Sequence, residues 1–358
     1  MIKKIICLPL IAIVVASVIV GNVIADFYSS EINSLLCPPI HDNEDLDRQQ
    51  EEGQKLSKQI IQEGAVLVKN DGNDKVETIK LWKSIRADLA TKHPNFEMVS
   101  EWANPAQSLE AGFDSDFVLD HRGTCSHLLF RLDEYDSEAH TPLLMKYDEE
   151  VYNKFKTDLL KRLSEAKKLN KSLSFISGNH DTLRIANYLD DLALRQAYVF
   201  LLTMPGVPFI YAGDEIGTHS KPIPSVEGGF QRTGTRMPMR FDSTKNAGFS
   251  TANKTFLPTN EDDSTVEEME KDPTSLLHFI QKLIEIRNKE SVLTSDEFEL
   301  LDGNVLSYRR GNITVYINIT NDIQTIQSEE KEILIASGSF KQDGGKIALS
   351  PKSSIVIK

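Results

Sequence analysis

Short apolar segments alternate with longer amphipathic ones between residues 65 and 242, and this alternation constrains the fold more than any other feature of the sequence. Short apolar runs are typical of buried strands, whereas apolar positions three and four residues apart are typical of helices. Repeated strand–helix units favour parallel strands joined by crossover helices, which is an α/β fold. The predicted strands are 65–68, 96–100, 113–119, 173–176 and 207–211, and the predicted helices are 76–89, 152–169 and 192–202.

The sequence changes character twice after the last strand of this series. Residues 217–256 are rich in Gly, Ser, Thr and Arg and are predicted to form a long loop. Asp272 and Pro273 supply an N-cap and a first-turn proline for a predicted helix that runs to Arg287. Alternating apolar residues then predict a small antiparallel domain, which includes a hairpin across Gly311. The strands predicted in this domain are 298–301, 305–308, 313–319, 334–335 and 355–357.

Polar residues follow three of the predicted strands at the point where each strand ends. They are Glu101, then Asn179-His180-Asp181, then Asp214-Glu215. In a strand–helix barrel the C-terminal ends of the strands meet at one mouth, so these side chains are expected to lie together. Glycoside hydrolysis needs one carboxylic acid to protonate the leaving oxygen and one carboxylate to attack carbon. A single acid at a strand end is more often a cap or half of an ion pair, but three clusters in succession predict a sugar-cleaving site.

The N-terminus has the pattern of a secretory signal peptide over residues 1–25. Two lysines precede an almost unbroken apolar run, and small or medium residues precede a cleavage position before Asp26. The alternative is an uncleaved membrane anchor formed by residues 5–24, because the run approaches the length that spans a bilayer. Both alternatives predict that the chain lies outside the cytosol, either secreted or periplasmic, or anchored to a membrane. Residues 26–64 are predicted to form a linker and a helix.

The charge balance and the cysteines limit the partners only loosely. The chain carries 53 acidic residues against 40 basic ones, which gives a net charge of −13. This excess of negative charge argues against nucleic acid or an anionic membrane surface as a partner. Outside the signal the cysteines are Cys37 and Cys125. An oxidising compartment would allow these two cysteines to pair, although their spacing does not require it.

Four segments resemble one family of enzymes. Residues 98–105, which include Glu101, resemble the strand-five motif of the α-amylase superfamily, glycoside hydrolase family thirteen. Residues 175–182 resemble its strand-seven motif, and residues 205–217 resemble its strand-eight segment. Residues 228–239 resemble a loop of the oligo-1,6-glucosidase and trehalose-synthase-like branch. The segments keep the order of the family, and the resemblance runs to the end of the chain.

The resemblance implies a retaining glycoside hydrolase that acts on α-glucosidic oligosaccharides without a cofactor. The family's usual calcium site depends partly on strands one to three and the small domain after them, which have no counterpart here, so no such metal is expected. Its fold would be a partial (β/α)8 TIM-type barrel over residues 65–290, with strands about four or five to eight, followed by an antiparallel β domain over residues 291–358. Glu101 would be the general acid and base, and His180 and Asp181 would hold the hydroxyls of the reacting sugar. The residues expected to contribute to substrate binding at the mouth are Asn179, Arg236 and Asp214.

The family's nucleophile is the point at which the sequence departs from the pattern. That aspartate ends a Gly-aromatic-Arg-aliphatic-Asp run on strand four, and no such run occurs here. Lys69-Asn70-Asp71 loosely mimics the arrangement and makes Asp71 a candidate substitute nucleophile, although lysine lacks the bidentate fork of arginine. Alternatively, residues 56–71 resemble the connector between the two domains of family-three β-glucosidases, and this second match is more literal.

Three functions remain open from the sequence alone. The first is a glycosidase that is truncated and impaired, because catalytic groups act as a unit and the nucleophile is not recognisable. The second is a catalytically silent, exported sugar-binding or partner subunit. The third is a non-functional fusion fragment whose sheet edges stay open. The presence of Glu101, His180 and Asp181 favours the first function over the second, since a scaffold does not need these residues.

Overall fold

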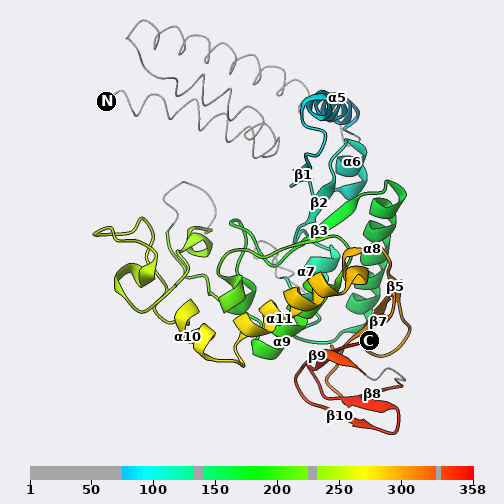
Figure 1. Cartoon of the computed structure of the whole chain (residues 1–358), viewed down its shortest axis with the longest axis vertical. Coiled ribbons are helices and arrows are strands. Elements are labelled where there is room, and N and C mark those ends of the chain that lie inside the picture. Colours follow the sequence, from blue (N-terminus) through cyan, green and yellow to red (C-terminus); the bar gives the residue numbers. More distant parts are fainter. Residues whose placement is uncertain (1–74, 132–140, 225–231, 328–331) are drawn as a thin grey trace, which may run out of the picture. The chain divides into compact units, whose positions relative to one another are not determined.

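The computed structural model describes residues 75–131, 141–224, 232–327 and 332–358 (Figure 1). The chain divides into two compact units. The described part of unit 1 consists of residues 75–117 and 164–172, and the rest of the described chain belongs to unit 2. The predicted signal peptide, the linker and helix after it, the strand at 65–68 and Asp71 all lie outside the described residues.

Unit 1 is built around a helix and two short parallel strands. Apolar residues recur on one face of the helix at helical spacing, and this face packs on Met98 and Phe113 in a small core. The strands pair in parallel, with Ser100 opposite Asp116. The predicted helix and both predicted strands of this region are confirmed, although the strands are shorter than expected. The elements are α5 (Val76–Lys92), β1 (Val99–Ser100), α6 (Pro105–Glu110) and β2 (Ser115–Val118).

A second parallel pair and its helices belong to unit 2, except for residues 164–172 at the end of α8 and the start of β3. β3 and β4 pair in parallel, with Ile176 opposite Phe209. Phe155, Phe175 and Phe200 bring α8, β3 and α9 together in the core, with ring centroids about 6 Å apart. The predicted helices and strands of this region are confirmed. The elements are α7 (Cys125–Leu129), α8 (Glu149–Lys168), β3 (Ser172–Ile176), η1 (Ile185–Asn187), α9 (Asp191–Thr203), β4 (Val207–Phe209) and η2 (Asp214–Ile216).

A glycine allows β4 to lie close to β3. Gly206 has a φ of +102°, and a Cβ atom at this position would lie 2.1 Å from the carbonyl oxygen of Leu173. No side chain can occupy that space without separating the strands. Gly206 therefore fixes the point at which the chain leaves α9 and enters the sheet.

The helix predicted from Asp272 to Arg287 is wrong at its start. The chain forms two helices here, and Asp272 ends the first instead of capping the second. Ser275 caps the second helix, because its hydroxyl accepts a hydrogen bond from the His278 N–H at 3.3 Å. The second helix packs along α9 (Figure 1). The elements are α10 (Val266–Lys271) and α11 (Leu276–Lys289), preceded in the predicted loop by η3 (Thr233–Arg236) and η4 (Lys245–Gly248).

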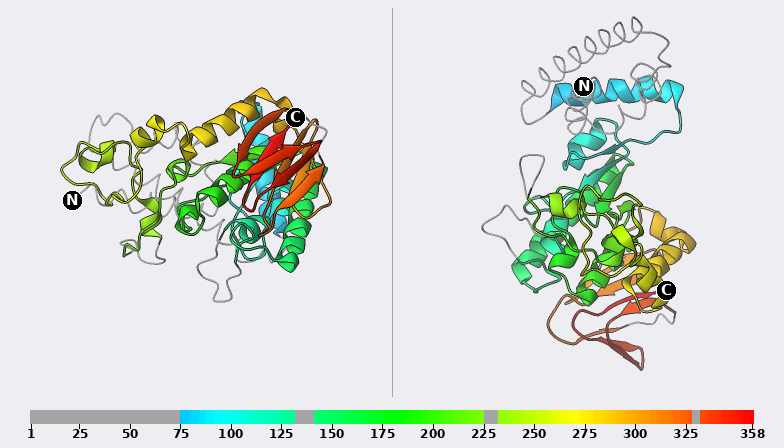
Figure 2. Two further views of the ribbon diagram at one scale, coloured as in Figure 1. Left: turned by 90° about the horizontal axis from the view of Figure 1, so that it is seen from below. Right: turned by 90° about the vertical axis from the view of Figure 1, so that its left-hand side faces the viewer.

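The C-terminal residues form two antiparallel sheets that share one core. The predicted hairpin is confirmed, with Arg310 opposite Ile313 in the β6–β7 pair. Apolar residues from both sheets, including Tyr316 and Leu349, pack together between them, and Figure 2 shows the strands grouped at this end of the unit. One sheet has the order β5 (Glu299–Leu300), β6 (Leu306–Arg310), β7 (Ile313–Ile317), β12 (Ser354–Ile357) and β9 (Ile333–Ser337), after η5 (Ser291–Thr294). The other has the order β10 (Phe340–Asp343), β11 (Lys346–Leu349) and β8 (Gln324–Gln327), which the sequence analysis missed.

Candidate functional site

The loop that follows β3 is held in one conformation by its own polar groups. The Asn179 side-chain oxygen accepts hydrogen bonds from the Asp181 N–H and from the Thr182 hydroxyl, both at 2.9 Å. The buried guanidinium of Arg131 donates to the Ser177 carbonyl and to the Thr182 hydroxyl from below. Arg131 thus joins both ends of the loop, and the residues between them have little freedom.

This loop presents Asp181 at the surface of unit 2 among three donors. The Asp181 Oδ1 atom lies 2.5 Å from Arg232 Nη1, 3.1 Å from Arg236 Nη2 and 3.3 Å from His180 Nε2. Arg236 also donates from Nε to the His180 carbonyl at 3.0 Å. The Asp181 side chain is still 31% exposed. The structure therefore brings together His180, Asp181 and Arg236 and adds Arg232 to them.

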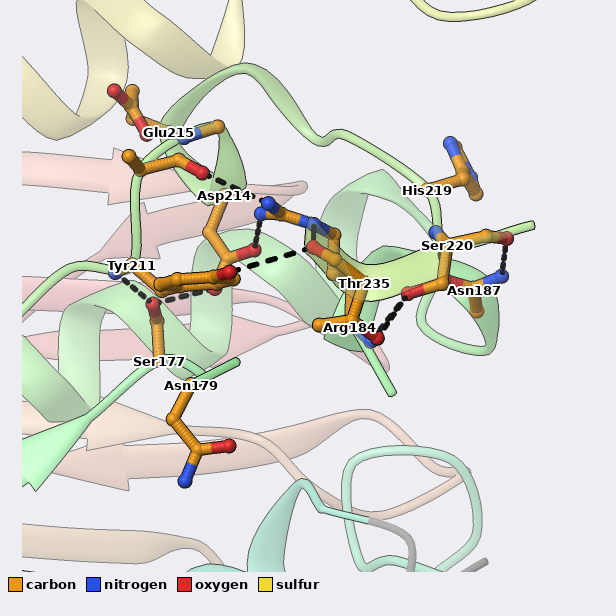
Figure 3. Close-up of polar contacts among 12 residues, drawn as sticks. Ser177, Asn179, Arg184, Asn187, Tyr211, Asp214, Glu215, His219, Ser220 and Thr235 are labelled. Carbon is orange, nitrogen blue, oxygen red and sulfur yellow. Dashed lines mark hydrogen bonds and ion pairs between the residues drawn. The ribbon is translucent and has the colours of Figure 1, made fainter. Parts of the chain in front are cut away.

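The loop that follows β4 is anchored by a buried ion pair. Asp214 accepts hydrogen bonds from the Ser177 hydroxyl and from Arg184 Nη1, both at 2.6 Å (Figure 3). Arg184 also donates to the Ala212 carbonyl at 3.0 Å and to the Thr235 carbonyl at 3.1 Å. The guanidinium group of Arg184 is thereby connected to two segments of unit 2, the loop after β4 and η3.

Burial and ion pairing act on Asp214 in opposite directions. The Asp214 side chain is only 1% exposed, and this burial raises the pKa of its carboxyl group, while the Arg184 charge lowers the pKa. The ring of Tyr211 covers Arg184, with the guanidinium carbon 4.4 Å from the ring centroid. Asp214 is thus almost completely buried in this structure, and its part in substrate binding stays a prediction.

Glu101 belongs to unit 1 and directly follows β1. Its side chain is exposed, while the neighbouring Trp102 is half-buried with its ring edge-on to Phe113 at 6.4 Å between centroids. Glu101 and Asp181 belong to different units, so the expectation that their side chains lie close together stays a prediction. Asp71 lies outside the described residues.

The sequence of these strand-end loops matches a known family. Residues 43–296 match the family described as "Alpha amylase, catalytic domain". The chain belongs to this α-amylase family. The match includes Glu101, the loop with His180 and Asp181, and the segment 56–71, whose resemblance to a family-three connector stays a prediction.

Two curated relatives illustrate how far the similarity reaches. The glucan 1,6-α-glucosidase of Streptococcus pneumoniae is 29% identical over 252 residues, which is 58% of this chain and 46% of the relative. The amino acid transporter heavy chain SLC3A1 of mouse is 32% identical over 143 residues, which is 38% of this chain and 21% of the relative. The chain thus spans less than half the length of both relatives.

A solved α-amylase-family structure confirms the fold class. A trehalulose synthase superposes with a TM-score of 0.62 at 20% sequence identity, covering 78% of this chain and 58% of the other. Together with the family match, this likeness shows the TIM-barrel fold of α-amylases. The number of barrel strands in this chain and a domain boundary at residue 290 stay predictions.

Four residues of the candidate site were not predicted from the sequence. Arg131, Arg184 and Arg232 make long-range contacts that no local pattern predicts, and Ser177 looked like a loop residue. Arg131 lies in Phe130-Arg131-Leu132-Asp133, which shares four residue types with the family's nucleophile run, but this segment follows Glu101 in the chain, whereas the family's run precedes the strand-five motif. Residue 133 lies outside the described residues, so this match is one of sequence alone.

No group of three or more His, Cys, Asp or Glu side chains suited to a metal ion occurs in the described ranges. None of the helices described is both long enough and apolar enough to cross a bilayer. Cys125 is a buried free thiol, and burial raises its pKa, whereas Cys37 lies outside the described part of the chain.

His219 and Asp263 form an ion pair beside this site, and its strength depends on pH. His219 Nδ1 lies 2.7 Å from Asp263 Oδ1, and this hydrogen bond raises the pKa of His219 above its ordinary value of 6.5. Because the folded-state pKa is raised, the stability that the pair contributes is fully present below about pH 6.5 and is lost as the pH rises through the raised pKa. The His219 side chain is half-exposed, so this contribution is below about 1 kcal/mol.

The variant Asp263→Asn should remove this pH dependence. We expect the decrease in the free energy of unfolding between about pH 5 and 8 to become smaller than in the unchanged protein. Urea unfolding at several pH values measures the effect. Asp262→Asn is the matched control, since Asp262 is exposed and contacts Lys221 at 2.8 Å instead of His219. Equal pH profiles for Asp263→Asn and the unchanged protein would contradict the assignment.

Proposed function

We propose that the loops after β3 and β4 of unit 2 bind a glucose ring of an α-glucosidic oligosaccharide. The observation that carries this proposal is the Asp181 carboxylate, which is partly exposed and yet held by Arg232, Arg236 and His180. A fixed carboxylate accepts hydrogen bonds from two neighbouring sugar hydroxyls, and an adjacent imidazole donates to a third oxygen. Little conformational freedom is lost when the ring binds, because the loop is already ordered.

We further propose that the reaction supported by this family is hydrolysis with retention at the anomeric carbon. Glu101 would give its proton to the glycosidic oxygen while a carboxylate attacks the anomeric carbon, and Glu101 would then take a proton from the water that releases the sugar. The sequence does not identify the aspartate that would attack the anomeric carbon. Asp71 is the sequence-based candidate, and it does not lie in the family motif. We therefore propose slow turnover in combination with sugar binding.

A catalytically silent binding or partner subunit is the second candidate. The similarity to the transporter heavy chain favours it, because that relative is named for a subunit role and not for hydrolysis. Both candidate functions require Asp181 if the chain binds a sugar. They differ in Glu101, which only an enzyme requires. We also propose an extracytoplasmic location on the basis of residues 1–25, and N-terminal sequencing of the exported protein tests cleavage before Asp26.

Asp181→Asn should weaken the binding of maltose, used as the probe, by about 10- to 100-fold. The loss corresponds to hydrogen bonds that involve a charged group, each contributing about 1.5–3 kcal/mol. Titration calorimetry of the full chain measures the effect. Asp191→Asn is the matched control, because this aspartate is exposed and contacts Arg195, four residues along the same helix. Equal maltose affinity for Asp181→Asn and the unchanged protein would reject the proposed site.

A further inference from the structure

The two residues that flank Glu101 are both held by one buried oxygen atom. The Ser100 hydroxyl donates a hydrogen bond to Asp116 Oδ1 at 2.6 Å, and the Trp102 N–H donates to the same atom at 3.1 Å. Asp116 lies on β2, opposite Ser100 in the parallel pair, and has no exposed surface. All of these residues belong to unit 1. A single carboxylate oxygen therefore fixes the chain immediately before and immediately after Glu101.

The backbone beyond Glu101 is strained, which shows that the turn is held in place. Ala103 has a φ of +60°, a left-handed conformation that residues with a Cβ atom adopt at a cost. Such a conformation persists where its surroundings determine it, and strained residues are concentrated at functional sites. On one side the turn is attached to β1, and on the other it enters α6 at Pro105. The Asp116 contacts lie between these two fixed ends.

A carboxyl group is an unfavourable choice for this buried position unless it has a task. Burial raises the pKa of Asp116, and hydrogen bonds from Ser100 and Trp102 act in the opposite direction. Hydrogen bonds from the Ser108 side chain and the Ala103 backbone also lower this pKa. A buried carboxylate destabilises the folded state even when it is hydrogen-bonded, whereas an apolar side chain would not carry this cost. Stability alone therefore does not account for Asp116.

We propose that Asp116 is a positioning residue for Glu101, which sets the direction of the Glu101 carboxyl group by holding Ser100 and Trp102. The inference rests on the proposed role of Glu101 in proton transfer. Its structural part, the fixing of the turn, is independent of that role. Displacement of a catalytic group by about 1 Å costs on the order of 100-fold in rate, so a loose turn would affect kcat much more than KM.

The test compares three variants of the full chain. Asp116→Leu removes the acceptor and places an apolar side chain of the same branching in the core, and its circular dichroism spectrum shows whether it folds. Asp116→Asn keeps an oxygen acceptor at the same position and should restore the turn. Asp114→Asn is the control, because Asp114 precedes the same strand but contacts Arg86, Lys171 and the Met98 N–H. A general loosening of unit 1 would affect this control as well.

One measurement reports the exposure of Trp102 in the turn, and a second reports the rate of hydrolysis. Iodide quenching of fluorescence reports Trp102, because the chain has two tryptophans and the other, Trp82, is buried. Asp116→Leu should increase the quenching, while Asp116→Asn and Asp114→Asn should not. With nitrophenyl α-glucoside, Asp116→Leu should lower kcat by about 100-fold at nearly unchanged KM, and Asp116→Asn should recover most of the rate.

The outcomes separate this inference from the proposed function. Unchanged quenching in Asp116→Leu, or an equal increase in Asp114→Asn, would overturn the inference. An increase in quenching that is specific to Asp116→Leu supports the fixing of the turn even if the unchanged protein shows no turnover. If turnover is present and Glu101→Gln leaves it unchanged, the proposed role of Glu101 fails, while the quenching result still decides whether Asp116 holds the turn.

Discussion

Replacement of Arg184 by methionine should lower the free energy of unfolding by about 3–5 kcal/mol. The variant leaves the Asp214 carboxylate buried without its cationic partner and removes two further hydrogen bonds, to the carbonyls of Ala212 and Thr235. Burial already raises the pKa of Asp214, and loss of the Arg184 charge raises it further. The decrease in the free energy of unfolding that Arg184→Met causes should therefore be smaller at acidic pH, where Asp214 takes up a proton, than at neutral pH. Urea unfolding followed by circular dichroism measures both effects.

The control for this prediction is an ion pair at the surface. Arg309→Met breaks the 2.9 Å contact with Glu299, in which both side chains are exposed. Such pairs contribute about 0–1 kcal/mol, so this variant should unfold nearly as the unchanged protein does. If Arg184→Met were no more destabilising than Arg309→Met, the ion pair with Asp214 would not anchor the loop.

Glu101→Gln should reduce any hydrolysis of nitrophenyl α-glucoside and maltose while leaving the fold intact. Removal of a general acid typically costs about 10²- to 10⁴-fold in rate. Nitrophenolate leaves without much help from an acid, whereas the sugar leaving group of maltose needs a proton. The rate loss should therefore be larger for maltose than for the nitrophenyl substrate, and steady-state kinetics on both substrates measures the difference.

The control is Glu110→Gln, a substitution of an exposed glutamate of unit 1 that contacts Lys83 at 3.1 Å. Its rates should match those of the unchanged protein. An equal, small effect of Glu101→Gln on both substrates would remove Glu101 from proton transfer. Asp71→Ala in the same assay tests the candidate nucleophile, because turnover by this route also requires the residue that attacks carbon.

Much of the fold could be predicted because its signals are local. The alternation of apolar and polar residues marked α5, α8, α9 and both parallel pairs, and Gly311 marked the β6–β7 hairpin. The strands β8, β10 and β11 were missed because their exposed positions carry Gln, Lys and Asp, which also occur in loops. The start of α11 was misplaced because Asp272-Pro273 and Ser275 are both plausible starts, and only the packing of the helices decides between them.

The candidate site was predictable to the extent that it lies in one stretch of chain. His180 and Asp181 are neighbours in sequence, so their proximity needs no knowledge of the fold. Arg232 and Arg236 contact Asp181 only because a loop returns more than fifty residues later. Asp116 gave no signal at all, since an aspartate in a short strand looks like an ordinary polar alternation. Contacts between distant segments are the part that a single sequence does not contain.

The buried ion pair of Arg184 with Asp214 and the partly exposed cluster of Arg232, Arg236 and Asp181 should respond differently to ionic strength. Arg184 and Asp214 are almost completely shielded from solvent, so dissolved ions screen their attraction very little. Arg232, Arg236 and Asp181 face water, where about 1 M salt reduces the reach of a charge to roughly 3 Å. Added salt would thus weaken the ion pairs of Asp181 while the buried Arg184–Asp214 pair stays intact. Ligand affinity would therefore change with salt concentration more than thermal stability does.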